Sequence, residues 1–281
     1  MGKKKSLVSK ILLILLFFIL ILFTIWTLFP IIWIFNTSLK PESELFRLPL
    51  KILPEKITLT NYFKINEFIP YLQFFFNSLI VSTSAAVLSV VCSMLSGYSL
   101  ARFFFRGKNT IRFSLLVTQM FPVILLIVPL MILLRKMHLI DNLFSLIFIY
   151  TALTIPFGTI LFEGLFLGIP AEIEECAMVD GCSRFGALMR VTLPIMVPGV
   201  AACFSFAFIG AWSELFAGIM FLNSQEKFTL PVGLFMLIGK YEVLWGALSA
   251  GIIMSLIPVL IMFFYAQKYI ISGLSAGAVK E

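Results

Sequence analysis

The segment from Glu172 to Gly181 concentrates side chains that could do chemistry. Glu172, Glu174, Glu175 and Asp180 are four of the fourteen acidic residues in a chain that is 60% hydrophobic. Carboxylates in such a group can form charge-assisted hydrogen bonds with a basic partner. The three glutamates fall in the first turns of a helix, where the helix dipole favours negative charge, and Gly181 supplies a left-handed stop. The pattern predicts a short acidic helix followed by a tight turn.

The chain lacks the residues that catalysis or metal binding would need. The chain has one histidine, His138, and Cys176 and Cys182 have no second cysteine pair, so we expect no metal site. The HExxH and GxxxxGK[ST] patterns do not occur, and Gly107-Lys108-Asn109 is not a nucleotide loop. The sequence has no basic stripe for nucleic acid. We therefore expect a chain that is not an enzyme and that binds no cofactor.

Apolar residues dominate the 281-residue chain. Its mean hydropathy is +1.06 and only 12% of its residues are charged, so a polar surface cannot cover it. A membrane-crossing helix needs about 20 apolar residues. Six such segments predict an all-α integral membrane protein with one transmembrane domain over residues 1–281. The expected spans are 11–35, 71–99, 113–134, 143–162, 199–222 and 243–268.

Two basic clusters predict the orientation of these spans. Lys3 to Lys10 precede the first span, and Arg102 to Arg112 follow the second. Because Lys and Arg are enriched on the cytoplasmic side, both clusters are expected inside. The apolar run after Lys10 is too long for a signal peptide, so we expect an uncleaved first helix. Six crossings then place both termini in the cytoplasm and Asn36 to Pro70 outside.

The longest cytoplasmic connection, 163–198, has structure of its own. A helix over 171–179 is expected to end at Asp180-Gly181. A second helix begins with Ser183 as N-cap, presents Phe185, Leu188 and Met189 at helical spacing, and ends before Leu193-Pro194. The two helices form a helix-turn-helix elbow outside the membrane, with an apolar edge.

The elbow resembles the EAA motif of permease subunits of ATP-binding-cassette (ABC) importers. Glu175-Cys176-Ala177 is followed by three residues, Gly181, nine residues and Val191-Thr192-Leu193-Pro194. Every spacing of the family pattern matches; Cys176 replaces the usual first alanine and Val191 the usual isoleucine. The resemblance implies a type I ABC importer permease fold in which the elbow is the coupling helix, seated on an ATPase. Glu175, Ala177, Gly181, Leu193 and Pro194 carry over directly from the motif as coupling residues. Glu174, Asp180 and Phe185 complete the predicted coupling set.

Further segments resemble the sugar-uptake branch, similar to the smaller permease subunit of the maltose importer. They are Asn77-Ser78-Leu79, Tyr98 to Arg102, Trp212-Ser213-Glu214 and the tail Gly273 to Lys280. The resemblance implies a bacterial plasma (inner) membrane protein that forms a heterodimer with a second permease. It also implies two ATPase subunits that use ATP and Mg, and a solute-binding protein outside the membrane that delivers a sugar or oligosaccharide. Permeases of this kind also carry polyols and glycerol phosphates, and the sequence does not name the solute.

The elbow's composition agrees with docking. Glu175 offers charge-assisted bonds, Gly181 the turn, and Phe185 with Leu188 an apolar edge. The alternative is an amphipathic hairpin lying on the inner membrane face, where its acidic residues would meet anionic lipid. A secondary transporter is the alternative for the whole chain. Such a carrier needs several ionisable groups inside the membrane, and only Glu214 qualifies.

Polar residues inside the spans are candidates for the substrate pathway. Glu214 with Trp212 would suit a sugar through hydrogen bonding and stacking, while an internal hydrogen bond to a neighbouring helix is the alternative for Glu214. Asn77, Gln119 and Tyr150 are similar candidates, each of which can instead hold helices together. Pro122 and Pro129 interrupt the third span, which either faces the pathway or is an ordinary kinked helix.

The C-terminal tail, 269–281, lacks the apolar period of a membrane helix. Gly273 and Gly277 are expected to keep it extended. By resemblance to maltose-type tails, it inserts between the two ATPase subunits, with Gly273, Gly277 and Lys280 as contacts.

Overall fold

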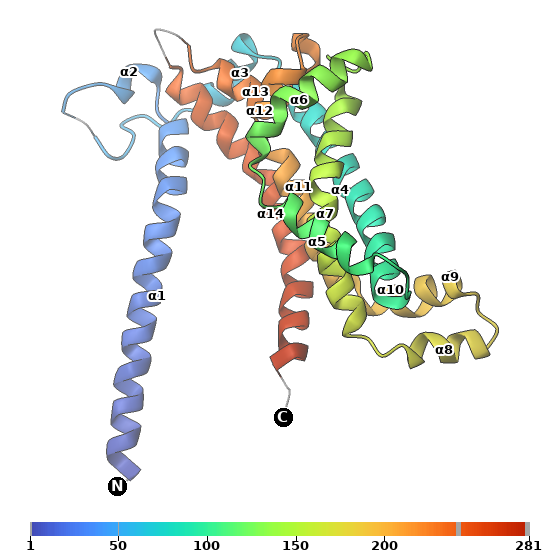
Figure 1. Cartoon of the computed structure of the whole chain (residues 1–281). Helices are drawn as coiled ribbons and strands as arrows, with labels where there is room; N and C mark the ends of the chain where they lie inside the picture. The colour runs from blue at the N-terminus through green and yellow to red at the C-terminus, as the bar shows by residue number, and fades with distance from the viewer. Residues whose placement is uncertain (1, 50, 240–242, 279–281) are drawn as a thin grey trace. The chain divides into compact units, whose positions relative to one another are not determined.

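The computed structural model describes the backbone of residues 2–49, 51–239 and 243–278, and the side-chain surroundings of 9–49, 51–239 and 243–267. Its elements are helices (Figure 1), which confirms the all-α prediction. The chain divides into two compact units. One comprises the residues up to Pro70 together with Met236–Met254. The other comprises Tyr71–Phe235 together with the residues from Ser255 onward.

The first unit joins the end of a long apolar helix to the start of the last helix. Asn61 is buried, and its amide nitrogen donates to the carbonyl oxygens of Ser38 at 2.9 Å and Lys40 at 2.8 Å. A carboxylate oxygen of Glu42 accepts from the backbone nitrogen of Gly246 at 3.1 Å. These bonds hold the connecting segments together. The helices are α1 (Gly2–Ser38), α2 (Glu42–Leu45), α3 (Thr60–Phe68) and the beginning of α14 (Trp245–Ala278).

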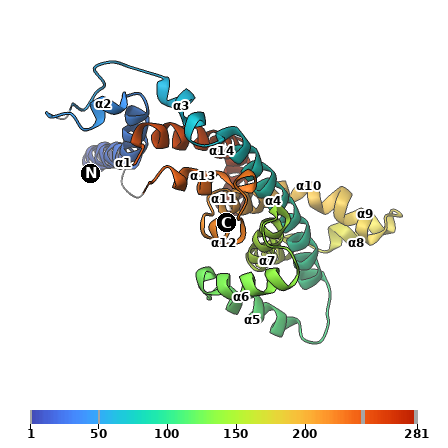
Figure 2. The same ribbon diagram turned by 90° about the horizontal axis from the view of Figure 1, so that it is seen from above.

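The second unit is built around two long helices, α4 and α7, which lie side by side (Figures 1 and 2). Both bury about half of their most apolar stretch within the protein. Helix α11 packs against both of them. The elements of this unit are α4 (Tyr71–Arg102), α5 (Lys108–Thr118), α6 (Val123–Lys136), α7 (Leu143–Leu167), α8 (Glu172–Val179), α9 (Arg184–Ala187), the π-helical turn η1 (Leu188–Thr192), α10 (Leu193–Ile195), α11 (Val197–Trp212), α12 (Phe216–Phe221), the 3₁₀ turn η2 (Gln225–Lys227) and α13 (Leu230–Met236).

Small residues allow α4 and α7 to approach closely. A Cβ atom on Gly97 would lie 2.7 Å from the Cβ of Phe162, and one on Gly158 would lie 2.7 Å from the Cβ of Ser93. Ser82, Ser89 and Ser93 of α4 are fully buried. Small residues at helix interfaces are the usual means of close packing in membranes, where lipid supplies no hydrophobic drive for association.

Within the described part of the chain, four helices are individually long and apolar enough to cross a membrane. They are Ser9–Ser38, Tyr71–Arg102, Leu143–Leu167 and Trp245–Gln267. They overlap the predicted spans 11–35, 71–99, 143–162 and 243–268.

The two remaining predicted spans are broken rather than continuous. Over 113–134, α5 and α6 meet at an angle of 101°. Pro122 is the N-cap of α6 with extended backbone, and it has no N–H with which to continue α5. Over 199–222, α11 ends at Trp212 and α12 starts at Phe216. Glu214 lies in this second break and accepts from the backbone nitrogen of Ala217, so a side chain replaces the interrupted helical bonds.

The structure contradicts two smaller predictions. The second elbow helix does not end before Leu193-Pro194 but continues to Ile195, because the wider π-helical turn at Leu188–Thr192 precedes the proline. The tail is not extended up to Ala278, since Gly273 and Gly277 lie within α14. A glycine costs a helix only about 1 kcal/mol relative to alanine, which an established helix tolerates. Lys280 lies outside the described residues.

Candidate functional site

The elbow, Glu172–Ile195, projects from the end of the α4 and α7 pair (Figures 1 and 2). Its turn has the predicted geometry: Gly181 adopts a φ of 92°, in the left-handed region, and donates from its backbone nitrogen to Met178 O at 3.1 Å. Ser183 caps α9 as predicted, because its hydroxyl oxygen accepts from Gly186 N at 3.0 Å. These local bonds define the angle between the two elbow helices.

Glu174 fastens the elbow to the end of α4. Its side chain is 6% exposed. One carboxylate oxygen accepts from the Tyr98 hydroxyl at 2.9 Å, and the other pairs with the Arg102 guanidinium at 2.9 Å. Arg102 also donates to the carbonyl oxygen of Ile169, just before the elbow, at 2.9 Å. Glu174 was predicted among the coupling residues; the structure commits its carboxylate to bonds within the chain.

A second contact fastens α9. The Arg184 guanidinium lies over the ring of Phe103, 5.0 Å from its centroid, in a cation–π arrangement. Phe103 in turn packs edge-on against Tyr98, which packs against Phe166 of α7. Both elbow helices are thus attached to the same end of α4. This role of Tyr98, Arg102 and Arg184 was not predicted, although the end of α4 is basic and the start of α8 is acidic.

The remaining predicted elbow residues divide into an exposed and a buried set. Glu175 and Asp180 are exposed, as is Pro194, while Ala177 and Leu193 are half-buried. Phe185 is 61% exposed, as a docking residue should be, but Leu188 is 2% exposed and packs in the core with Phe162 and Phe166. The predicted edge of Phe185 with Leu188 is therefore wrong. Val179, which is 86% exposed, joins Phe185 as an apolar residue of the elbow surface.

A second buried acid, Glu163 of α7, pairs with Arg112 of α5. The guanidinium Nε donates to a Glu163 carboxylate oxygen at 2.6 Å, and the Glu163 side chain is 7% exposed. Since α5 has few other contacts with the rest of the unit, this pair helps to hold it against α7. Arg112 was predicted only to mark the cytoplasmic side of the membrane, and Glu163 was not among the predicted site residues.

Two of the predicted pathway residues come together at the break in the fifth span. The Tyr150 hydroxyl donates to Oε2 of Glu214 at 2.7 Å. Both residues line a recess of about 280 Å³, whose other walls come from α6, α7, α11 and α12. The internal hydrogen bond that was the alternative for Glu214 is therefore present. The recess is mainly apolar, with Thr154 as a further polar residue.

The other three candidates lie apart from this recess. Asn77 donates to the carbonyl oxygens of Glu226 and Phe228 at 2.9 and 3.0 Å, so it holds a loop to α4. Trp212 is buried and stacks on Phe208, which leaves its ring unavailable to a sugar in this conformation. Gln119 lies exposed in the break between α5 and α6 and donates to Leu115 O at 3.3 Å.

Asp141, which was not among the predicted site residues, binds the loop after α12 to the start of α7. Its carboxylate accepts from the Ser224 hydroxyl at 2.6 Å, from the backbone nitrogens of Asn223 and Ser224, and from the Lys227 ammonium at 3.0 Å. These donors, the Ser224 hydroxyl first, hold the pKa of Asp141 well below its usual value. The residue lies between α6 and α7, outside the helices.

Comparison with known proteins matches residues 89–272 to the family of binding-protein-dependent transport system inner membrane components. The sulfoquinovosyl glycerol transport system permease protein SmoH of Agrobacterium fabrum is 36% identical over 90% of this chain and 89% of its own length. The trehalose/maltose transport system permease protein MalG of Thermococcus litoralis is 33% identical over 92% of this chain and 94% of its own.

A solved structure supports the fold. One chain of a bacterial ABC transporter involved in the import of the acidic polysaccharide alginate superimposes with a TM-score of 0.80 at 24% identity. The match covers 93% of this chain and 97% of that one. With the projecting elbow, the broken spans and the family match over 89–272, the chain belongs to the binding-protein-dependent transport system inner membrane components and is a permease subunit of an ABC importer.

Proposed function

We propose that this permease forms half of a pathway for importing a sugar or oligosaccharide, and that a second permease supplies the other half. The names of the similar permeases support a carbohydrate, since they include sulfoquinovosyl glycerol, arabinooligosaccharide and trehalose/maltose systems. The recess beside Tyr150 and Glu214 offers a hydroxyl and a carboxylate, which suit a hydroxyl-rich solute. A polyol, a glycerol phosphate or another small polar solute is the alternative.

The energy source in this proposal is a pair of ATPase subunits that bind ATP and Mg, because this chain has no GxxxxGK[ST] loop. The observation that carries the proposal is that some residues of the elbow attach it to α4 while others are exposed. Glu174 and Arg184 hold the elbow to α4, while Glu175, Val179 and Phe185 remain exposed. A rigidly held helix with exposed apolar and acidic side chains can transmit movement from a docked subunit to the membrane helices.

The proposed arrangement places the elbow and both termini in the cytoplasm and the loop bound by Asp141 outside. A solute-binding protein would deliver the solute on that outer side. The clusters Lys3 to Lys10 and Arg102 to Arg112 support this orientation through the enrichment of basic residues on the cytoplasmic face. The solute-binding protein would account for most of the selectivity, and the permease pair for passage.

The test is solute uptake by the reconstituted assembly. Proteoliposomes holding this permease, its partner permease and the ATPases should take up a radiolabelled oligosaccharide only with ATP and Mg inside and the solute-binding protein outside. Polyols and glycerol phosphates tested in parallel would identify the alternative solutes. Uptake without ATP, driven by an ion gradient, would instead indicate a secondary transporter and contradict the proposal.

Elbow variants test the docking part separately. Glu175→Lys and Phe185→Asp should each abolish uptake and release the ATPase subunits during purification, while the permease pair stays in the membrane. Glu172→Lys is the matched control, since Glu172 is also an exposed acid of α8 but lies outside the EAA motif. If Glu175→Lys retains the ATPases and normal uptake, the docking surface is not the elbow.

A further inference from the structure

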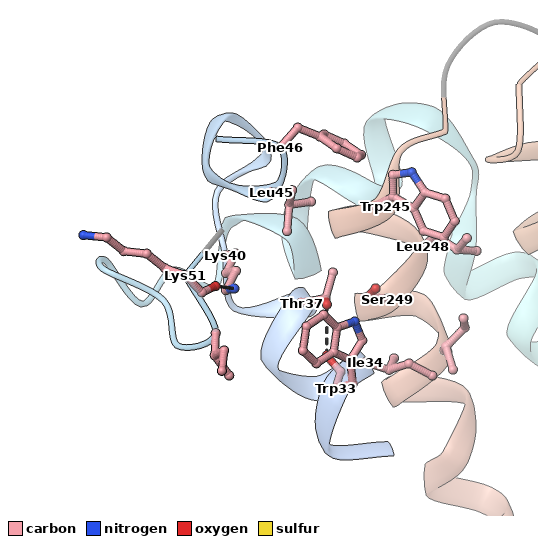
Figure 3. A pocket seen from close by; sticks show the side chains of 12 residues that line it. Trp33, Ile34, Thr37, Lys40, Leu45, Phe46, Lys51, Trp245, Leu248 and Ser249 are labelled. Carbon is pink, nitrogen blue, oxygen red and sulfur yellow. Dashed lines mark hydrogen bonds between the residues drawn. The ribbon is translucent and has the colours of Figure 1, made fainter. Parts of the chain in front are cut away.

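The first unit contains a cavity that the transport proposal does not use. It measures about 350 Å³ and lies between the end of α1, the segment that connects α1 to α3, and the start of α14 (Figure 3). Its walls are mostly apolar, with Trp33 and Ile34 from α1, Phe46 from the connection, and Trp245 and Leu248 from α14. The volume falls within the range of about 300–1,000 Å³ typical of small-molecule sites.

Two buried polar groups reach this apolar cavity from different elements. Lys40 lines it from the connecting segment and is 6% exposed. Its ammonium donates to the Lys51 carbonyl oxygen at 2.7 Å, and the ion pairs of the described residues give it no carboxylate partner. An ammonium has three N–H donors, so two remain for a ligand. Ser249 lines the cavity from α14 and is 5% exposed, and the hydrogen bonds of the described residues give its hydroxyl no partner.

A buried cation and a free hydroxyl in an apolar cavity favour a ligand with an anionic group and an apolar body. Burying a charge without a partner is costly, so an anion at Lys40 would relieve an existing penalty. The aliphatic walls would exclude water from a hydrocarbon chain, whereas a free inorganic anion would leave them unfilled. A sugar would leave most of its hydroxyls unpaired against Ile34, Leu248 and Ile252.

The surroundings point to the membrane as the source of this ligand. The stretch Ser9–Ser38 of α1 is long enough to cross a bilayer, and none of its most apolar window is buried within the chain. The cavity adjoins the last turns of this helix, where a spanning helix leaves the hydrocarbon layer. Trp33 and Trp245 are half-exposed there, and tryptophan is enriched at that depth of a bilayer.

We propose that this cavity binds a phospholipid. Its phosphate accepts hydrogen bonds from the Lys40 ammonium and the Ser249 hydroxyl, and one acyl chain packs against Trp33, Ile34 and Leu248. The bound lipid joins α1 to the start of α14, two segments far apart in the sequence. It is a structural lipid of the assembled transporter and is not the transported solute.

Native mass spectrometry of the purified transporter, with dioleoyl phosphatidylglycerol titrated into delipidated complex, measures this binding. Wild-type complex should retain one more phospholipid than Ser249→Phe, which fills the cavity. Lys40→Met keeps the length of the side chain and removes the charge, and it should weaken that binding step at least tenfold. Lys56→Met is the matched control, since Lys56 is an exposed lysine of the same connection that does not line the cavity.

Two further measurements make the outcome decisive. Ser249→Ala removes only the hydroxyl, so it should keep the fold even where Ser249→Phe disrupts it. It should also weaken retention of the lipid. Inorganic phosphate added in excess should not displace the lipid, because the acyl chain contributes to binding. Equal retention by wild type, Lys40→Met and Ser249→Ala would overturn the proposal. A disulfide between the cysteine of Phe46→Cys and a cysteine of the second permease would also overturn it, because a protein segment would then cover the cavity.

Discussion

The Tyr98 hydroxyl donates to Oε2 of Glu174 at 2.9 Å, across 76 positions of sequence, and joins the end of α4 to the first helix of the elbow. Arg102, one turn further along α4, donates to the other carboxylate oxygen and forms an ion pair with it. The elbow is therefore held to α4 by buried, charge-assisted bonds rather than by the chain connection alone. Movement of the elbow must carry the end of α4 with it as long as these bonds persist.

Glu174→Gln tests this attachment. The change leaves the Arg102 guanidinium, 10% exposed, without its counter-charge, and breaking a buried pair in this way costs about 3–5 kcal/mol. We expect the elbow to become sensitive to limited proteolysis and the amount of solute transported per ATP hydrolysed to fall. Glu172→Gln, at an exposed acid of the same helix, should change neither. If Glu174→Gln matches wild type both in its sensitivity to limited proteolysis and in the amount of solute transported per ATP hydrolysed, the attachment is refuted.

Gly181 provides a test of the elbow turn. Its φ of 92° is a conformation that a side chain disfavours by about 1–2 kcal/mol. Nothing lies within 4 Å of a Cβ built there, so the effect of Gly181→Ala is one of backbone strain and not of collision. Gly181→Ala should reduce uptake, and Gly181→Asp should abolish it while the permease still inserts. Gly164→Ala is the control, because Gly164 also has open space but ordinary helical backbone.

Asp141 predicts a dependence of stability on pH. Because its pKa is lower in the folded protein than in the unfolded chain, its contribution is present above the unfolded value of about 3.9 and is lost as the pH falls toward the folded value. In thermal unfolding of the purified complex, Asp141→Asn should therefore be less stable than wild type at pH 7, with the difference shrinking below about pH 4. Glu226→Gln, an exposed acid in the partner loop, should match wild type throughout. A constant difference across this pH range would contradict the assignment.

Orientation can be measured with single cysteines. In a background without the four native cysteines, a cysteine at Ser6 or Asn109 should be shielded from an impermeant maleimide added to intact cells, and one at Thr58 should react. Permeabilised cells provide the control for reactivity, and all three should then label. Labelling of Asn109 but not Thr58 in intact cells would reverse the orientation and remove the elbow from the compartment that contains ATP.

The C-terminal residues provide a further prediction. Deletion of Ser275 to Glu281 should uncouple ATP hydrolysis from uptake or weaken retention of the ATPases, if the tail contacts them as the resemblance implies. A stop after Ala278 removes only three residues and separates the role of the described end of α14 from that of Lys280. Normal uptake together with normal stimulation of ATPase activity by the solute-binding protein in the longer deletion would mean that the tail is dispensable.

Much of this protein could be read from its sequence, because the strongest signals were local. Long apolar runs predict membrane helices whatever surrounds them, since burying an unpaired backbone in lipid is costly. Gly181 and Ser183 define the elbow turn because a left-handed residue and a helix cap act on their immediate neighbours. The EAA spacing identified the family for the same reason, as it lies within one continuous segment.

The tertiary structure decided which of these residues are available to a partner. Glu174 and Glu175 are adjacent and chemically alike, but one is buried against Tyr98 and Arg102 and the other is exposed. Leu188 and Phe185 share a helical spacing, but Leu188 is buried in the core and Phe185 is exposed. Glu214 lies in the break of the fifth span, where Tyr150, 64 positions away, and the backbone of Ala217 satisfy its carboxylate. Contacts between distant segments depend on how helices pack, and no local pattern carries that information.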